Sequence, residues 1–226
     1  GVVVAFLLGS GPWWETVLFG AAAGLGISGL GFCVQHDGGH GAYSSKGVVN
    51  RLTARVLDVI GASSYVWHRK HNQLHHTYPN LAGVDDDIDA GFLARLAPGQ
   101  KRRFIHRFQH IYLWGLYAFL SLKWLWIDDY YNIGRGGIGA QRMERPRGWE
   151  WVVFFGGKLF SITWMLVLPM MAHGVWIGLL FHVVLQMTAG VVLSVVFQLA
   201  HCVEEADFPA VPTPENETWD FATHQL

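Results

Sequence analysis

Two short segments carry the side chains best suited to chemistry, and both are rich in histidine. The first reads QHDGGH, with His36 and His40 four residues apart, and the second reads HRKHNQLHH, with His71, His75 and His76. Two histidines four residues apart on a helix share one face, with Cβ atoms about 5–6 Å apart, so they can bind one metal ion. Neutral imidazole is the commonest metal ligand and suits iron, copper, zinc and nickel. The chain has no His-Glu-x-x-His or Glu-x-x-His motif, so we predict a metal site built mainly from imidazoles.

Three long apolar stretches must position these histidines. They are 16–35, 151–172 and 174–200, and Lys158 is the single Lys, Arg, Asp or Glu residue within them. Each is long enough to cross a bilayer as a helix. Three buried helices of a soluble protein are the alternative, which the near absence of charge disfavours.

The composition agrees with a membrane protein. Of the 226 residues, 51% are hydrophobic and 15% are charged, whereas ordinary soluble domains are about 25% charged. Four glycines in the first apolar stretch, at positions 24, 26, 29 and 31, favour close helix packing in a membrane. A net charge of −1 gives no indication of a nucleic-acid partner.

The basic residues predict the membrane topology. Of the 16 Lys and Arg residues, 15 lie in 46–147, so the positive-inside rule places 36–150 in the cytoplasm. The apolar run Val2–Leu8 is interpreted as the end of a truncated membrane helix, and 111–127 as an aromatic helix at the membrane interface. We expect an all-α integral membrane fold with two transmembrane hairpins and a cytoplasmic helical cap. The chain is then one incomplete domain with four parts: a first hairpin (1–35), the cap (36–150), a second hairpin (151–200) and the start of a cytoplasmic C-terminal region (201–226).

The histidine segments, together with the stretches VDDDIDAGFLARLAP and FQLAHCVEEADFP, make the chain similar to the membrane fatty acid desaturase family. The resemblance runs from about Gly29 to the end and is greatest to the acyl-lipid and acyl-CoA branch seen in bacteria. That family holds two iron ions with three histidine boxes. The first box resembles His36-x3-His40, and the second resembles His71-x3-His75-His76.

The third box of the family, His or Gln followed by x-x-His-His, is absent from this sequence. His224-Gln225-Leu226 resembles the family's lead-in to that box, so we expect a chain that is truncated at both ends. Such a chain would lack at least two iron ligands and be inactive alone.

The resemblance implies further ligands. Family members use another histidine as an iron ligand at about the place of His201, which joins the five box histidines in our predicted ligand set. His224 and His68 are weaker candidates for the same role.

Several polar residues near the histidines are candidates for supporting them. We expect Asp37 to orient a ligand imidazole through its second ring nitrogen, and Asn72 to form a local hydrogen bond beside the ligands. The acidic run at 85–89 is interpreted as a solvated loop, with support of a histidine box as the alternative. The same choice applies to three acidic residues near His201: Glu204, Glu205 and Asp207.

The resemblance also implies an activity. It is that of an O2-dependent oxidoreductase that introduces a double bond into a lipid-linked or CoA-linked fatty acyl chain, which enters a hydrophobic tunnel. Two iron ions would activate O2, and two electrons would come from ferredoxin or a cytochrome b5-like donor. The chain has no His-Pro-Gly-Gly haem segment, so we expect a separate donor. An integral protein of the bacterial plasma membrane, with its metal site on the cytoplasmic side, is favoured.

Three other functions stay open. A hydroxylase or epoxygenase could use the same scaffold and would differ in its product. A membrane cytochrome with a bis-histidine haem predicts paired histidines inside two facing spans, whereas here the pairs follow the span ends. A metal transporter or other membrane metal-binding protein predicts acidic ligands at depth, but 16–35 and 174–200 contain no carboxylate.

Overall fold

Long apolar helices dominate the molecule. The structure is a computed structural model, and it describes residues 1–81, 83–203 and 206–208. Within these residues, three helices are long and apolar enough to cross a membrane: Trp13–Gly39, Trp149–His173 and Val175–His201. They contain 16–35, 151–172 and all but the first residue of 174–200, so the prediction of a mostly helical chain with three candidate membrane spans is confirmed. The division into two hairpins and a cytoplasmic cap stays a prediction.

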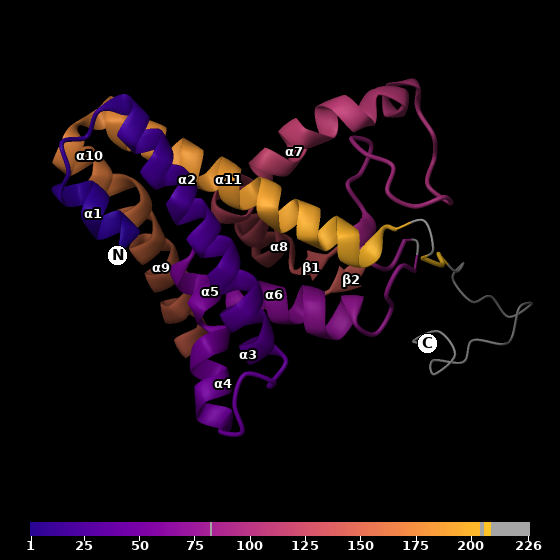
Figure 1. Cartoon of the computed structure of the whole chain (residues 1–226). Helices are drawn as coiled ribbons and strands as arrows, with labels where there is room; N and C mark the ends of the chain where they lie inside the picture. The colour runs from indigo at the N-terminus through magenta and orange to yellow at the C-terminus, as the bar shows by residue number, and fades with distance from the viewer. Residues whose placement is uncertain (82, 204–205, 209–226) are drawn as a thin grey trace, which may run out of the picture.

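The first long helix packs along the last one. It consists of α2 (Trp13–Leu30), the π-helical segment η1 (Gly31–His36) and α3 (Asp37–Gly39). The most extensive contact between helices joins α2 to α11 (Val175–His201) (Figure 1). Gly24 permits this approach, because a Cβ there would lie 2.5 Å from the Leu185 carbonyl oxygen. The expectation of close packing at all four glycines is wrong for Gly26 and Gly29, which face open space.

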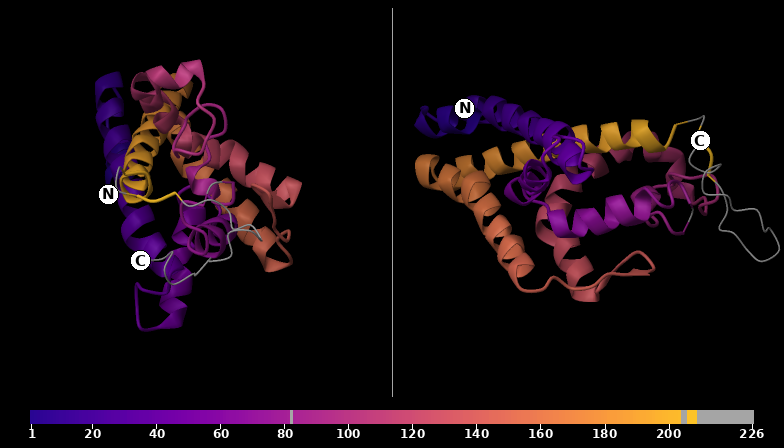
Figure 2. Two further views of the ribbon diagram at one scale, coloured as in Figure 1. Left: turned by 90° about the vertical axis from the view of Figure 1, so that its right-hand side faces the viewer. Right: turned by 90° about the horizontal axis from the view of Figure 1, so that it is seen from below.

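The other two spans meet at a sharp turn. Helix α9 (Trp149–Ile162), the π-helical segment η6 (Thr163–Val167) and α10 (Leu168–His173) form one helix that stops at Gly174. A φ of 86° at Gly174 reverses the chain into α11, a conformation that favours glycine. From this turn α9 and α11 diverge (Figure 2). Beside it lies α1 (Val2–Leu8), where the Phe6 ring stacks on Phe181 with centroids 4.4 Å apart.

Short elements connect the first span to the later ones. The helix that runs from α7 (Gln109–Lys123) through α8 (Asp129–Arg135) contains the residues expected at the membrane interface, and α7 packs against α11. Its depth relative to a membrane stays a prediction. The connecting elements are α4 (Gly47–Ala54), α5 (Val56–Val59), α6 (Ser64–Trp67), the π-helical η2 (His68–His75), the 3-10 helices η3 (Asp86–Ile88) and η4 (Phe104–Phe108), α7 (Gln109–Lys123), the π-helical η5 (Trp124–Asp128), α8 (Asp129–Arg135) and the antiparallel strands β1 (Gly137–Ile138) and β2 (Gln141–Arg142).

A buried ion pair ties these elements to the span that contains α9. Lys158 Nζ donates to Asp129 Oδ2 at 2.6 Å and to the carbonyl oxygens of Gly61 and Trp124 at 2.8 and 3.1 Å. Asp129 Oδ2 also accepts the backbone N–H of Ser63, the N-cap of α6, at 2.8 Å. Buried charges are stable only when they are paired and hydrogen-bonded. The pair therefore holds the start of the second histidine segment against α8 and α9.

We expect Lys158→Met to lower the free energy of unfolding by about 3–5 kcal/mol, because Asp129 is left buried without its partner. Adding Asp129→Asn should recover most of that loss. Lys123→Met is the control. It removes an ion pair with Asp128 in which the lysine is 59% exposed, so it should lower the free energy of unfolding by less than about 1 kcal/mol. Denaturation in detergent measures all three, and equal losses for Lys158→Met and Lys123→Met would contradict the role of the buried pair.

Candidate metal centre

The first histidine pair lies at the end of the first long helix. His36 closes η1, and the His40 backbone N–H donates to the His36 carbonyl at 3.0 Å. The glycines between them allow tight packing, because a Cβ at Gly38 would collide with Thr53 of α4 and a Cβ at Gly39 with the Trp67 ring. The two imidazoles are thereby held with their ring centroids 4.5 Å apart.

The second histidine segment folds as a π-helix. This changes which of its histidines lie on the same face of the helix. The His76 backbone N–H donates to the carbonyl of His71, five residues earlier, at 3.0 Å. Residues five apart lie about 140° apart around an α-helix, but the wider π turn brings them together. The Nε2 atoms of His71 and His76 are consequently 3.2 Å apart. The sequence prediction, which assumed an α-helix, instead placed His71 on the same face as His75, four residues later.

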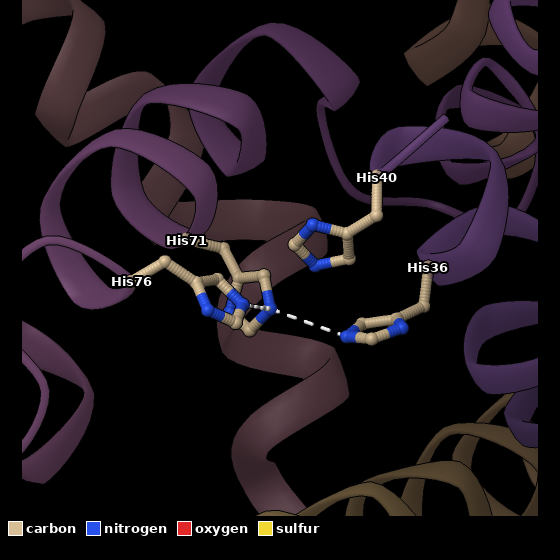
Figure 3. A group of neighbouring side chains, drawn as sticks. All are labelled: His36, His40, His71 and His76. Atoms are coloured by element: carbon tan, nitrogen blue, oxygen red, sulfur yellow. Dashed lines mark hydrogen bonds between the residues drawn. The ribbon is translucent and has the colours of Figure 1, made fainter. Parts of the chain in front are cut away.

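Four imidazoles from the two segments converge on one point (Figure 3). His71 Nε2 lies 3.3 Å from His36 Nε2, and one ligand atom from each ring lies within 4.8 Å of all the others. The four residues are His36, His40, His71 and His76. A hydrogen bond from Asn72 Nδ2 to the Gly39 carbonyl, 2.8 Å long, joins the two segments behind the rings.

A second group lies around His75. His201, at the end of α11, places its Nε2 2.8 Å from His75 Nε2. His201 Nδ1 faces the Phe197 carbonyl oxygen, which assigns the ring proton to Nδ1 and leaves Nε2 free to bind. His71, His75 and Asp87 are also close enough to hold an ion together. The structure thus brings together all six histidines in the predicted ligand set.

Two carboxylates of the acidic run lie against these rings, one of them buried and the other mostly covered. Asp85 is 2% exposed and accepts from His75 Nδ1 at 2.8 Å, and Asp87 Oδ2 lies 3.5 Å from His71 Nδ1. The expectation of a solvated loop is therefore wrong for Asp85 and Asp87, although Asp89 is exposed. Chain reversal explains the difference, because Asn80 has a φ of 58° and turns the chain back toward His75. The Pro-Asn pair before the acidic run was the available turn signal.

The surroundings of two of the clustered imidazoles keep their rings neutral. Both His40 and His76 keep an exposed edge, but partial desolvation within the cluster and the neighbouring imidazoles lower the pKa of each to about 4. Both rings are then in the form that binds a metal at pH 7. Burial alone would raise the pKa of Asp87, but Lys70 Nζ, 3.0 Å away, outweighs it and holds that pKa well below its usual range. The ionised Asp87 beside His71 makes the imidazole a stronger ligand.

The other predicted residues lie at the edge of the cluster or outside it. Asp37 Oδ1 is 3.5 Å from His36 Nδ1 and half exposed. His68 is exposed and belongs to neither histidine group, and Asp207 is exposed as well. Three candidates lie outside the described residues: Glu204, Glu205 and His224.

An apolar cavity between the long helices reaches the first histidine group. His36 forms part of its wall, beside the Trp67 ring. The apolar wall residues come from α2 and η1 (Ile27, Phe32), α5 and the residue after it (Leu57, Ile60), and α11 (Leu193, Phe197).

Comparisons with known proteins agree on one family. The family model described as fatty acid desaturase matches residues 12–224. The sn-1 linoleoyl-lipid 6-desaturase of Arthrospira platensis is 34% identical over 196 residues, which cover 86% of this chain and 53% of the relative. The acyl-lipid (8-3)-desaturase of Physcomitrium patens is 35% identical over 212 residues, which cover 90% of this chain and 43% of the relative. The chain spans about half the length of these relatives, and no solved structure matches it significantly.

Asp85→Asn should weaken metal binding. The amide is a poorer acceptor for His75 Nδ1–H, so we expect metal affinity to fall about 10–100-fold. Competition with a chelator of known affinity measures the change. Asp89→Asn is the matched control and should bind metal as the wild type does. Equal affinities in the two variants would show that Asp85 does not support a ligand.

Proposed function

The chain belongs to the fatty acid desaturase family, and from that premise we propose that it forms the metal-binding membrane core of an O2-dependent fatty acyl desaturase. Such an enzyme is an oxidoreductase that introduces a double bond into an acyl chain. The observation that carries the proposal is the convergence of six histidines, from two segments and α11, beside an apolar cavity.

Two iron ions would be held by the histidine groups. His36, His40, His71 and His76 would hold one ion, and His75 and His201 would hold the second. Imidazole nitrogens about 2.0–2.1 Å from a first-row metal lie about 3.0–3.4 Å from one another. The Nε2 separations of 3.2 and 3.3 Å around His71 fit that requirement. The iron pair would supply the activation of O2 and the oxidising power to remove hydrogen from an unactivated methylene, which no side chain supplies.

The chain's own residues would bind the acyl chain and align the ligands. The apolar cavity walls would hold the hydrocarbon against His36 and exclude water. Asp85 and Asp87 would accept from the Nδ1 atoms of His75 and His71, so that the Nε2 atoms face the metals. Asp37 would act in the same way on His36, from a more exposed position.

A lipid-linked acyl chain is the proposed substrate. The relatives in Arthrospira platensis and Physcomitrium patens are named for acyl chains linked to lipids, which favours a lipid ester over a CoA thioester. Ferredoxin or a cytochrome b5-like protein would supply the electrons. The basic residues of 46–147 favour a metal site on the cytoplasmic side of the membrane.

The iron content of the full-length protein tests this proposal. We expect about two iron ions per chain in the wild type. The double variant His75→Ala, His76→Ala should lose both, because His76 belongs to the first histidine group and His75 to the second. His68→Ala removes an exposed histidine outside both groups and should leave the iron content unchanged. Little iron in the wild type, or iron unaffected by the double variant, would contradict the di-iron centre. An oxygenated rather than unsaturated product would identify a hydroxylase or epoxygenase.

Filling the cavity should restrict the acyl chains that are accepted. A Cβ at Gly31 would lie 3.6 Å from Leu193 Cδ2 and 3.9 Å from Ile60 Cδ1, so a larger side chain there would occupy the cavity. We expect Gly31→Leu to lower kcat/KM for long acyl chains about 10-fold or more relative to shorter ones, with the iron content kept. Gly29→Leu, two residues earlier and facing open space, is the control. Gas chromatography of the products measures both, and an unchanged chain-length profile in Gly31→Leu would rule out this cavity as the acyl site.

A further inference from the structure

Gln35 is a polar residue in the wall of the apolar cavity. It lies in η1 directly before His36, lines the cavity and is 3% exposed. Much of the surrounding wall is apolar and includes Ile27, Phe32 and Leu193. An amide in such surroundings is stable only when it is hydrogen-bonded.

The amide nitrogen of Gln35 has no hydrogen-bond partner within the part of the chain that the structure describes. Ser121, a second polar residue of the wall, differs because its hydroxyl donates to Gln186 Oε1. An unsatisfied buried donor lowers stability, whereas a methionine would fill the same space without that cost. A residue of the cavity wall therefore carries an unsatisfied donor, and it is adjacent in sequence to a proposed iron ligand.

We propose that Gln35 Nε2 donates a hydrogen bond to the acyl carbonyl oxygen of the substrate and thereby sets where along the chain the double bond forms. This inference rests on the proposed desaturase function. The methylenes of an acyl chain offer no acceptor, and the carbonyl of its ester or thioester link is the strong acceptor attached directly to it. A lipid ester and a CoA thioester share this group.

The position of Gln35 directly before His36 predicts where along the acyl chain the double bond forms. Because Gln35 and His36 are adjacent residues of one helix, a carbonyl held by Gln35 would keep the carbons close to the carboxyl end beside the proposed metal centre. The new double bond would then form a few carbons from the carbonyl. Two relatives have small position numbers in their names, the sn-1 linoleoyl-lipid 6-desaturase of Arthrospira platensis and the Delta(5) fatty acid desaturase A of Dictyostelium discoideum, which agrees with this geometry.

Combining one substitution with one change of substrate, in the full-length protein, tests the hydrogen bond between Gln35 and the acyl carbonyl. Wild type and Gln35→Met are each given an ester-linked acyl lipid and its ether-linked analogue, which lacks the carbonyl. We expect the wild type to have a KM for the ester about 3–10-fold below that for the ether, the equivalent of one neutral hydrogen bond. Gln35→Met should lose this difference and form a mixture of double-bond positions from the ester. Repeating the ester arm with the CoA thioester shows which acyl carrier is recognised.

Two further readouts separate recognition from a structural role. Gln35→Met should keep its iron and melt at or about 2–4 °C above the wild type, because an unsatisfied donor has been removed. Ser121→Ala, the control, should keep the ester preference and a single product. The inference is overturned if Gln35→Met retains the ester preference and product position, loses iron, or melts below the wild type, since the amide would then act within the fold. A wild type that forms no unsaturated product would instead refute the proposed function.

Discussion

The site depends on the meeting of the two histidine segments at His71. Its Nε2 lies within 3.3 Å of His36 Nε2 and 3.2 Å of His76 Nε2, and three features of the chain make that approach possible. The π turn of η2 brings His76 round to His71, small residues at 38 and 39 let the first segment pack against Thr53 and Trp67, and Asn72 joins the segments through the Gly39 carbonyl. Ring nitrogens at this distance are close enough to share one cation, and a cation between them would hold the two segments together.

The membrane helices determine where this meeting occurs. The helix that begins with α2 leads into the first histidine pair and α11 ends at His201, and these two helices pack closely at Gly24. The second segment is held from the other side. Lys158 in the span containing α9 pairs with Asp129, which binds the N-cap of α6, and a small core that includes Leu74 and Phe154 covers the back of η2. The buried Lys158–Asp129 pair thus fixes an element next to the ligands.

Much of this arrangement could be predicted from the sequence, because apolar length and histidine spacing are local signals. The three spans and the five box histidines were accessible in that way, whereas His201 was predicted only from the resemblance to the desaturase family. The pairing of His71 with His76 was not, since the spacing argument assumed 3.6 residues per turn and the chain adopts a π turn. The burial of Asp85 and the covering of Asp87 depend on a chain reversal, and the exposure of Gly26 and Gly29 depends on which face α2 turns toward α11. These features of burial and exposure depend on tertiary contacts between distant segments, and such contacts produce only weak patterns in a single sequence.

Locating iron by anomalous X-ray scattering in crystals of the full-length protein tests the metal centre most directly. We predict two peaks beside the histidines. One should lie about 2.0–2.3 Å from ring nitrogens of both segments, with His36 and His71 among its ligands, and the other should lie beside His75 and His201. A single peak bound by one segment alone, or iron located within the spans away from His71, would contradict the conclusion that the two segments build one centre.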